Sequence, residues 1–137
     1  AGRRYLYHDP CHSPMKTHPP LRVAGSLLRS EVRLSDRCCG EAGTLAVSRP
    51  DISTQIRFRK QQELQAGVRA FGDQEGGEVK ILTSCPACQQ GLLRYRDDTG
   101  LDSDYIVVEL ANQRLGDDWR QRFIERARDG GIERVLL

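Results

Sequence analysis

The sequence predicts an α/β domain with a mainly parallel sheet flanked by helices. Two observations lead to this fold class. Short apolar or β-branched segments alternate with segments of helical periodicity along the 137 residues, which is the pattern of parallel-sheet domains. In addition, a cysteine-bearing loop follows each of the first three predicted strands. Because parallel strands end at one edge of their sheet, we expect these loops to converge at the carboxyl edge, where such sheets bind ligands.

The first third of the chain predicts a strand, a loop, a helix and a second strand. The first strand covers residues 3–8 and ends at Asp9-Pro10, and residues 11–18 form a proline-rich loop. Apolar residues recur at helical spacing over 21–30, and alternation over 31–35 predicts the second strand. The pair of adjacent cysteines follows it.

A long helix is predicted next. Ser48 is its expected cap, Pro50 lies in its first turn and Phe71 marks its end. The expected core stripe is Ile52, Ile56, Leu64, Val68 and Phe71. The expected outer face carries Arg57, Arg59 and Lys60. Residues 72–77 are glycine-rich and predict a flexible surface loop.

The remaining elements begin with a buried strand over 79–83 and a helix from Pro86 to about Arg96. A loop is expected over 97–103, a strand over 105–108 and a short helix over 111–115. Asp117 is the expected cap of a last helix that ends before Gly130-Gly131, and 132–137 predicts a final strand or a tail. The residues expected to bury that helix are Leu115, Trp119, Phe123 and Ala127.

Composition narrows the functional class. The formal net charge is +2, which is too small to indicate nucleic-acid binding. No stretch approaches the roughly 20 apolar residues of a membrane span, and no secretory leader is present, so we expect a cytoplasmic protein. The chain starts almost directly with a strand and lacks an initiator Met. We therefore expect residues 1–137 to be a single cysteine-rich domain cut from a longer polypeptide.

All five cysteines lie in the three loops, at Cys11, Cys38, Cys39, Cys85 and Cys88. Cys85 is expected at the cap of the helix that Pro86 begins, with Cys88 one turn further, so that both sulfurs face the same way. The amino end of a helix favours thiolate over thiol. Thiolates are the form that binds metals or performs redox chemistry.

The adjacent Cys38 and Cys39 would point to opposite faces of a regular strand. Both sulfurs reach one site only if the backbone there is irregular. Gly40 and Gly43 supply the required conformational freedom.

The cysteine pattern alone allows four interpretations. Iron–sulfur clusters use thiolate ligands, structural zinc sites often use four cysteines, and Cys85 with Cys88 can form a redox pair. The fourth is that the cysteines are buried small hydrophobic residues, which fits poorly with their position in loops rich in Pro and Gly. The spacing favours an iron–sulfur centre over zinc.

Three motifs resemble those of the cysteine-rich "CCG" domain family: 8–12 (His-Asp-Pro-Cys-His), 38–43 (Cys-Cys-Gly-Glu-Ala-Gly) and 84–88 (Ser-Cys-Pro-Ala-Cys). The resemblance covers about residues 4 to 95. The family includes the cysteine-rich subunit of heterodisulfide reductase, the iron–sulfur subunit of glycolate oxidase, and related lactate-utilisation and anaerobic glycerol-3-phosphate dehydrogenase subunits. The stretch 7–57 also resembles the C-terminal part of bacterial fusions that join a flavin-linked oxidase domain to iron–sulfur modules.

The resemblance implies that all five cysteines hold a [4Fe-4S] cluster, of the non-cubane type found in heterodisulfide reductase, or zinc as in some family members. It implies an electron-transfer module that passes electrons between a flavin domain and an acceptor such as a quinone or a disulfide. FAD would be bound in the parent protein only. Its implied partners are that flavin-linked oxidase domain and other iron–sulfur modules. The alternative is a structural zinc-binding or interaction domain that uses the same cysteines.

No catalytic residue is predicted, and we expect no independent turnover. His12 is a candidate for an additional metal ligand or for a hydrogen-bond donor to a cysteine sulfur, and a position on the surface is equally compatible with the sequence. For His18 the surface position is favoured. Asp9 and Glu41 favour turn or cap roles over acid–base chemistry. A group of arginines favours a solvated face over a docking site for an acidic partner: Arg37, Arg49, Arg57 and Arg59.

Overall fold

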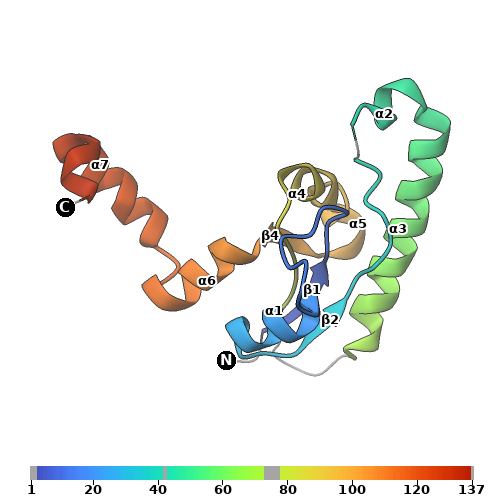
Figure 1. Ribbon diagram of the computed structural model, residues 1–137, viewed down its shortest axis with the longest axis horizontal. Helices are drawn as coiled ribbons and strands as arrows, with labels where there is room; N and C mark the ends of the chain where they lie inside the picture. Colours follow the sequence, from blue (N-terminus) through green and yellow to red (C-terminus); the bar gives the residue numbers. More distant parts are fainter. Residues whose placement is uncertain (1–2, 42, 73–77, 137) are drawn as a thin grey trace. The chain divides into compact units, whose positions relative to one another are not determined.

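The computed structural model describes residues 3–41, 43–72 and 78–136, with side chains described up to residue 130. Within these ranges the strands β1 (Arg4–His8), β2 (Val32–Leu34), β3 (Val79–Thr83) and β4 (Asp102–Tyr105) form one sheet. Their spatial order is β2-β1-β3-β4, and every neighbouring pair is parallel (Figure 1). The predicted α/β fold with a parallel sheet is confirmed.

The strand register sets the carboxyl edge of the sheet. Tyr7 pairs with Leu34 in β2, and His8 pairs with Thr83 in β3. Thr83 in turn pairs with Tyr105 in β4. The central strands therefore end level with one another, and the loops that follow them leave the sheet at the same edge, as expected.

Helices cover this sheet and enclose its core. They are α1 (Pro20–Leu28), α3 (Pro50–Ala70), α4 (Pro86–Leu93) and α5 (Arg96–Thr99), while the short α2 (Leu45–Ser48) packs against α3. Figure 1 shows the long helix α3 running beside the strands. The main hydrophobic cluster combines strand residues with residues of α3, α4 and the segments that follow them: Leu6, Leu64, Phe71, Ile81, Leu92, Tyr95 and Leu101. Gly67 of α3 lets this helix approach β1, because an added Cβ would lie 3.1 Å from Leu6 Cδ1.

The long helix differs from its predicted pattern at three positions. Ser48 belongs to α2, and Arg49 is the residue that precedes α3, so the predicted cap is wrong. Ile52, expected in the core, is 37% exposed, because the core contacts of α3 lie further along the helix at Leu64 and Phe71. Lys60, expected on the outer face, is fully buried; its ammonium group has acceptors inside the fold, described below.

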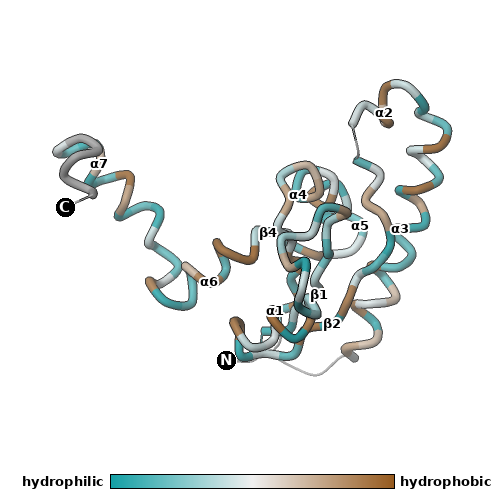
Figure 2. Tube along the Cα trace, in the orientation of Figure 1, coloured by the Kyte–Doolittle hydropathy of each residue, from teal (hydrophilic) through white to brown (hydrophobic). Residues whose placement is uncertain are grey.

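The predicted loop at 97–103 and strand at 105–108 are also wrong. α4 ends at Leu93 rather than near residue 96, α5 intervenes, and Gly100 with φ +70° ends α5. β4 then pairs with β3 only as far as Thr83, where β3 ends. The following apolar run, brown in Figure 2, starts helix α6 (Ile106–Leu115) instead. The length of the neighbouring strand, rather than β propensity, decides where β4 stops.

The chain divides into two compact units, residues 1–106 and 107–137. The second unit contains most of α6 and helix α7 (Trp119–Leu136). α7 begins two residues after the predicted cap at Asp117 and continues through Gly130-Gly131, so the predicted stop and the final strand at 132–137 are wrong for residues up to 136.

The predicted burial of the second unit is corrected as well. Leu115 is 55% exposed and Phe123 is 46% exposed, whereas Trp119 and Ala127 are partly buried. The Trp119 indole Nε1 donates a hydrogen bond to Asn112 Oδ1 at 2.8 Å. Helical periodicity identifies an apolar face, but it does not supply an element that covers that face.

Two further sequence predictions concern loops and membranes. Gly72, with φ +72°, follows α3, but the remainder of the predicted loop, residues 73–77, lies outside the described residues. In the part of the chain that the structure describes, none of the helices combines the length and the hydrophobicity that crossing a bilayer requires.

Candidate metal centre

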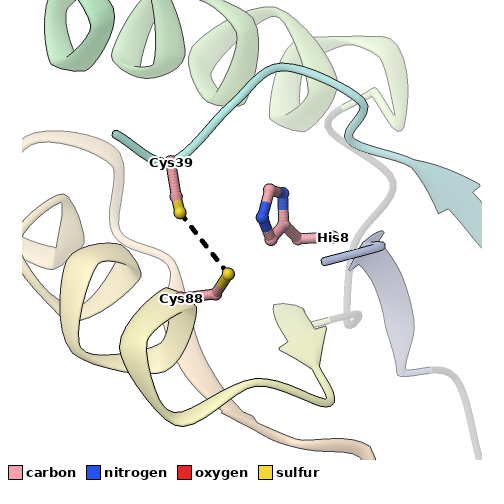
Figure 3. Close-up of side chains that lie close together, drawn as sticks. All are labelled: His8, Cys39 and Cys88. Carbon is pink, nitrogen blue, oxygen red and sulfur yellow. Dashed lines mark hydrogen bonds between the residues drawn. The ribbon is translucent and has the colours of Figure 1, made fainter. Parts of the chain in front are cut away.

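Two cysteine sulfurs from distant parts of the chain meet at the carboxyl edge of the sheet. Cys39 lies in the loop after β2, and Cys88 lies in the first turn of α4. Their Sγ atoms are 3.4 Å apart, and each residue is only 6% exposed. Figure 3 shows the two sulfurs facing each other with the His8 ring beside them. The convergence expected from the strand order therefore takes place for this pair.

The start of α4 explains the position of Cys88. Cys85 is the N-cap residue, with extended φ −123° and ψ 128°, and Pro86 is the first helical residue, as predicted. The backbone N–H of Gln89 donates to the Cys85 carbonyl at 2.9 Å, which closes the first turn. Cys85 is partly buried, and its thiol interacts with that of Cys88. The CxxC segment thus presents two sulfurs to one side, as expected.

The tandem cysteines separate in the structure. Gly40 has φ +74°, and an added Cβ there would lie 3.0 Å from Ile56 Cγ2, so glycine is required for both conformation and space. The backbone is irregular, as predicted. Cys39 is buried, however, and Cys38 is exposed, with its Sγ accepting a hydrogen bond from the Gly40 N–H at 3.3 Å.

The first predicted loop is the most open part of the site. Cys11, His12 and His18 are all exposed and line a cavity of about 510 Å³. Asp9 accepts a hydrogen bond from Ser13 Oγ at 2.6 Å, which is the expected turn role. Cys11 follows the strand edge closely in the chain, but it is not part of the close group of ligand atoms formed by the described residues.

His8 completes that close group. It is the last residue of β1 and is 3% exposed. One of its ring nitrogens and the sulfurs of Cys39 and Cys88 all lie within 4.8 Å of one another. The sequence predicted no separate role for His8. Its position at the end of a strand that leads directly into a cysteine loop could have indicated a place at the cysteine site.

The contact between the two buried sulfurs shifts their pKa values in opposite directions. The hydrogen bond with Cys88, helped by His8 and by the Glu41 backbone N–H, lowers the pKa of Cys39 to about 4 although burial opposes this shift. The same hydrogen bond, together with burial, raises the pKa of Cys88. These shifts favour the thiolate form at Cys39 and the thiol form at Cys88. A thiolate binds a metal ion without first losing a proton.

A buried polar cluster lies behind His8. Lys60 Nζ donates to Ser35 Oγ at 2.6 Å, to the Arg37 carbonyl at 2.8 Å and to Glu63 Oε1 at 3.0 Å. It also lies 3.2 Å from His8 Nδ1. These acceptors explain why Lys60 points inward, against the prediction. Burial lowers the pKa of Lys60, and its contact with the Glu63 carboxylate opposes that change.

Glu41 ties the tandem-cysteine loop to α4. Its carboxylate forms an ion pair with Arg94 and lies 3.9 Å from Arg57 Nη2. Gly91 makes room for it, because an added Cβ would lie 2.4 Å from Glu41 Cγ. Glu41 therefore has a structural role, and Arg57 is partly buried beside it rather than part of a solvated face. The exposed Arg49 pairs with Asp51 at 2.9 Å.

Arg37 and Arg59 complete the arginine group. Both residues are exposed, as expected for a solvated face. They line a second cavity, of about 570 Å³, whose wall also includes Glu63.

The donor set fits a thiolate-bound metal centre. Sulfur and imidazole nitrogen are ligands of zinc, and thiolates are the ligands of iron–sulfur clusters. Two sulfurs on one tetrahedral zinc, at about 2.3 Å each, would be about 3.8 Å apart, so the observed 3.4 Å requires only a small separation. Burial of both sulfurs would also shield a bound centre from water.

Comparison with known proteins gives two family matches. The family described as "Cysteine-rich domain" (CCG) matches residues 5–92. A family described as a domain of unknown function, DUF3400, matches residues 93–137. No solved structure matches the chain significantly.

Three curated relatives are similar to this chain. An uncharacterized iron–sulfur protein of Methanocaldococcus jannaschii is 27% identical over 80% of this chain and 22% of its own length. A similarly named protein of Methanococcus maripaludis is 26% identical over 76% of this chain and 21% of its own. A fumarate reductase (CoM/CoB) subunit of Methanothermobacter marburgensis is 25% identical over 86% of this chain and 24% of its own.

The chain thus spans between a fifth and a quarter of the length of these relatives. The CCG family match covers more than half of the 137 residues and includes every cysteine. By this match, and with its cysteine loops at one edge of a parallel sheet, the chain belongs to the cysteine-rich CCG domain family.

Proposed function

We propose that this chain is an iron–sulfur-binding electron-transfer module of a larger oxidoreductase. The observation that carries the proposal is the meeting of Cys39 and Cys88 at a buried edge of the sheet, with their sulfurs 3.4 Å apart. Relatives named as iron–sulfur proteins and as a reductase subunit support the same conclusion. The proposal treats residues 1–137 as one module.

The proposed ligands are Cys11, Cys38, Cys39, Cys85 and Cys88. The thiols of Cys39, Cys85 and Cys88 already interact in the structure. Cys11 and Cys38 are exposed, in the loops after β1 and β2, and both would have to turn toward the other three to bind the same centre. A bound [4Fe-4S] cluster, of the non-cubane type when all five cysteines take part, would supply one-electron transfer.

The protein around the ligands contributes in two ways. The parallel strands bring the loops together, and the Glu41–Arg94 ion pair holds the tandem-cysteine loop against α4. Both lower the cost of assembling the site, because they position the ligands.

The electron donor proposed for this module is a flavin-linked oxidase domain of the parent protein, where FAD would be bound. Other iron–sulfur modules of that protein, and an acceptor such as a quinone or a disulfide, complete the proposed chain in a cytoplasmic enzyme. The relative named as a fumarate reductase subunit supports a place among redox partners. We propose no independent turnover for this domain outside that enzyme.

Anaerobic reconstitution with iron and sulfide tests the proposal. The wild type should take up about four irons and four sulfides and give an EPR signal, whereas Cys39→Ser should bind less iron or give an altered signal. Val47→Ala is the matched control, because Val47 is 85% exposed and lies outside the site. If the wild type binds no iron and binds stoichiometric zinc instead, the proposal is contradicted.

A structural zinc site is the second candidate. One observation favours it: the closest ligand atoms of the described residues are a mixed set of one imidazole and two sulfurs, and zinc accepts such sets in structural sites. Anaerobic purification followed by metal analysis separates the candidates. Iron with acid-labile sulfide supports electron transfer, whereas colourless protein with one tightly held zinc supports the structural role.

A further inference from the structure

The tandem-cysteine loop, residues 38–41, lies between two helices. On the side of α3, an added Cβ at Gly40 would lie 3.0 Å from Ile56 Cγ2. On the side of α4, an added Cβ at Gly91 would lie 2.4 Å from Glu41 Cγ. Figure 3 shows the loop passing between α3, in green, and α4, in yellow. Side chains of both helices therefore border the candidate metal centre.

Several buried polar atoms around this loop have no hydrogen-bond partner among the described residues. Three lie on α3 or between α4 and α5, and a fourth lies at the end of β3, directly before the CxxC segment: Ser53 Oγ, Arg57 Nε, Tyr95 Oη and Thr83 Oγ1. The remaining two such atoms belong to residues of α4 and β4 that are hydrogen-bonded to each other. The Nε–H of an arginine can only donate, and hydroxyl groups can donate as well. Since native proteins leave few buried groups unpaired, donors gathered beside one site indicate an acceptor that binds there.

Tyr95 lies on the same face of the helix as Cys88. Positions 88, 92 and 95 have the spacing that lines one helical face, and Arg94 and Tyr95 keep right-handed helical dihedral angles beyond the last residue of α4. Helical side chains lean toward the N-terminus of their helix, which for Tyr95 is the cysteine end. The residue is 4% exposed and belongs to the main hydrophobic cluster. Its ring is thus held by packing, while its hydroxyl group has no partner among the described residues.

The charges that act on the Tyr95 hydroxyl agree with this position. Burial raises the pKa of Tyr95 to about 12; the Arg57 charge opposes the rise, and negative charge at Cys39 adds to it. The hydroxyl therefore lies within electrostatic reach of the Cys39 sulfur, and it carries its proton at neutral pH. It can donate a hydrogen bond to an anionic group bound there.

We propose that the Tyr95 hydroxyl donates a hydrogen bond to a sulfur of the metal centre that the cysteines bind. The inference deepens the proposed function and rests on it. Tyr95 is not a metal ligand in this arrangement. A hydrogen bond to a ligand sulfur or a sulfide stabilises negative charge, so Tyr95 raises the reduction potential of a bound iron–sulfur centre. The bound centre in turn gives the buried hydroxyl an acceptor.

Two buried tyrosines form a matched pair for a first test in the metal-free protein. The Tyr7 hydroxyl has a partner, Ser84 Oγ at 2.9 Å, whereas the Tyr95 hydroxyl has none among the described residues. Tyr7→Phe should therefore lower the denaturant midpoint, and Tyr95→Phe should leave it unchanged or raise it, because it removes only an unpaired polar atom. An equal loss in both variants would show that the Tyr95 hydroxyl is already bonded without metal, to a buried water for instance, and would overturn the inference.

Metal loading gives the second test. Reconstitution should raise the melting temperature less in Tyr95→Phe than in the wild type, and equally in Tyr7→Phe and the wild type. In EPR-monitored redox titrations, iron-loaded Tyr95→Phe should have a lower potential than the wild type. Phenylalanine retains the packed ring, so a purely structural role of Tyr95 would not move the potential. An unchanged potential together with an undiminished rise in melting temperature would overturn the inference.

The same experiment separates this inference from the proposed function. A wild type that binds zinc but no iron contradicts the proposed function, and the comparison of melting temperatures then tests the hydrogen bond in the zinc-bound protein, where thiolate sulfurs are the acceptors. A smaller rise in Tyr95→Phe would support the inference in that case, and an equal rise would overturn it. A wild type that binds neither metal contradicts both.

Discussion

The Sγ atoms of Cys39 and Cys88 lie 3.4 Å apart although the residues are 49 positions apart in the chain. Their loops follow β2 and β3, which flank β1 on opposite sides and run parallel to it. The contact thus crosses the carboxyl edge of three strands. Because the strands and α4 position both sulfurs, packing of the fold meets part of the ordering cost of a metal centre.

The first prediction concerns Gly91 in α4. Gly91→Ala would place a Cβ 2.4 Å from Glu41 Cγ and 3.0 Å from its Oε1, which forces Glu41 and the tandem-cysteine loop away from α4. We expect a loss of about 1–2 kcal/mol in the free energy of unfolding, since overpacking outweighs the better helix propensity of alanine. Urea unfolding measures the stability, and metal titration should show weaker binding.

Gly25 in α1 is the matched control. An alanine Cβ there would come no closer than 4.0 Å to a neighbouring atom, so Gly25→Ala should stabilise the protein by about 0.5–1 kcal/mol and leave metal binding unchanged. Equal effects of the two substitutions would contradict the role of Gly91 as the space for Glu41.

The second prediction concerns the thiolate in the metal-free protein. The pKa of Cys39 is lowered to about 4 by its hydrogen bond with Cys88, so one thiolate should persist through neutral pH. Its ultraviolet absorbance should stay constant from about pH 8 down to pH 5 and decline around pH 4. Cys39→Ser should lose this signal, whereas a thiolate that titrates near pH 9 would refute the assignment.

The sign of the effect on stability follows from the same shift. A thiol ordinarily titrates near pH 9.0, and folding moves the pKa of Cys39 down to about 4. This group therefore stabilises the folded state fully above pH 9, and its contribution is lost as the pH falls to 4. The raised pKa of Cys88 acts oppositely above pH 9. Metal-free protein should thus lose stability between about pH 7 and pH 4, and Cys39→Ser should lose less.

The third prediction concerns Lys60. Lys60→Met removes the donor that serves Ser35, Glu63 and the Arg37 carbonyl, leaving buried acceptors without that partner. We expect a loss of about 3 kcal/mol, in the range measured when one member of a buried charged pair is removed. Denaturant unfolding gives the value. The exposed Lys16→Met should change stability by less than about 0.5 kcal/mol, and similar values for the two variants would show that Lys60 is not part of the fold's interior.

A fourth prediction concerns removal of the metal. A ligand that binds only the folded state raises stability with its concentration and affinity. Reconstituted protein should therefore melt at a higher temperature than the metal-free form, and a chelator should abolish the difference. In Cys88→Ser the difference should be much smaller, because one of the buried sulfurs is missing. A melting temperature that is independent of metal would argue that the cysteines hold no metal when folded.

The fold class and the position of the cysteine loops were predictable from the sequence. Alternating short strands and helices, with cysteines after the first three strands, follow from local patterns that the structure confirms. Cys85 as a helix cap before Pro86 was equally predictable, because proline at the first helical position is a local steric preference. These features depend on residues close together in sequence.

Other features depend on partners far along the chain. The apolar run at 105–108 has the composition of a strand, but β3 ends at Thr83 and offers β4 no further backbone to pair with, so α6 begins at Ile106. Helical spacing predicts Lys60 on the outer face. In the structure its ammonium group points into the fold, because its hydrogen-bonding partners lie in β1, in the loop after β2 and in its own helix.

The same division applies to the candidate site. The presence of five cysteines in loops of a parallel sheet follows from the amino-acid order alone, because cysteine spacing and strand order are local properties. The burial of Cys39 against Cys88, the exposure of its neighbour Cys38, and the position of His8 between both sulfurs and Lys60 emerge only in the folded molecule. Burial and hydrogen bonding between distant residues set the charge of each group, and these arise only when the strands, loops and α3 are packed together.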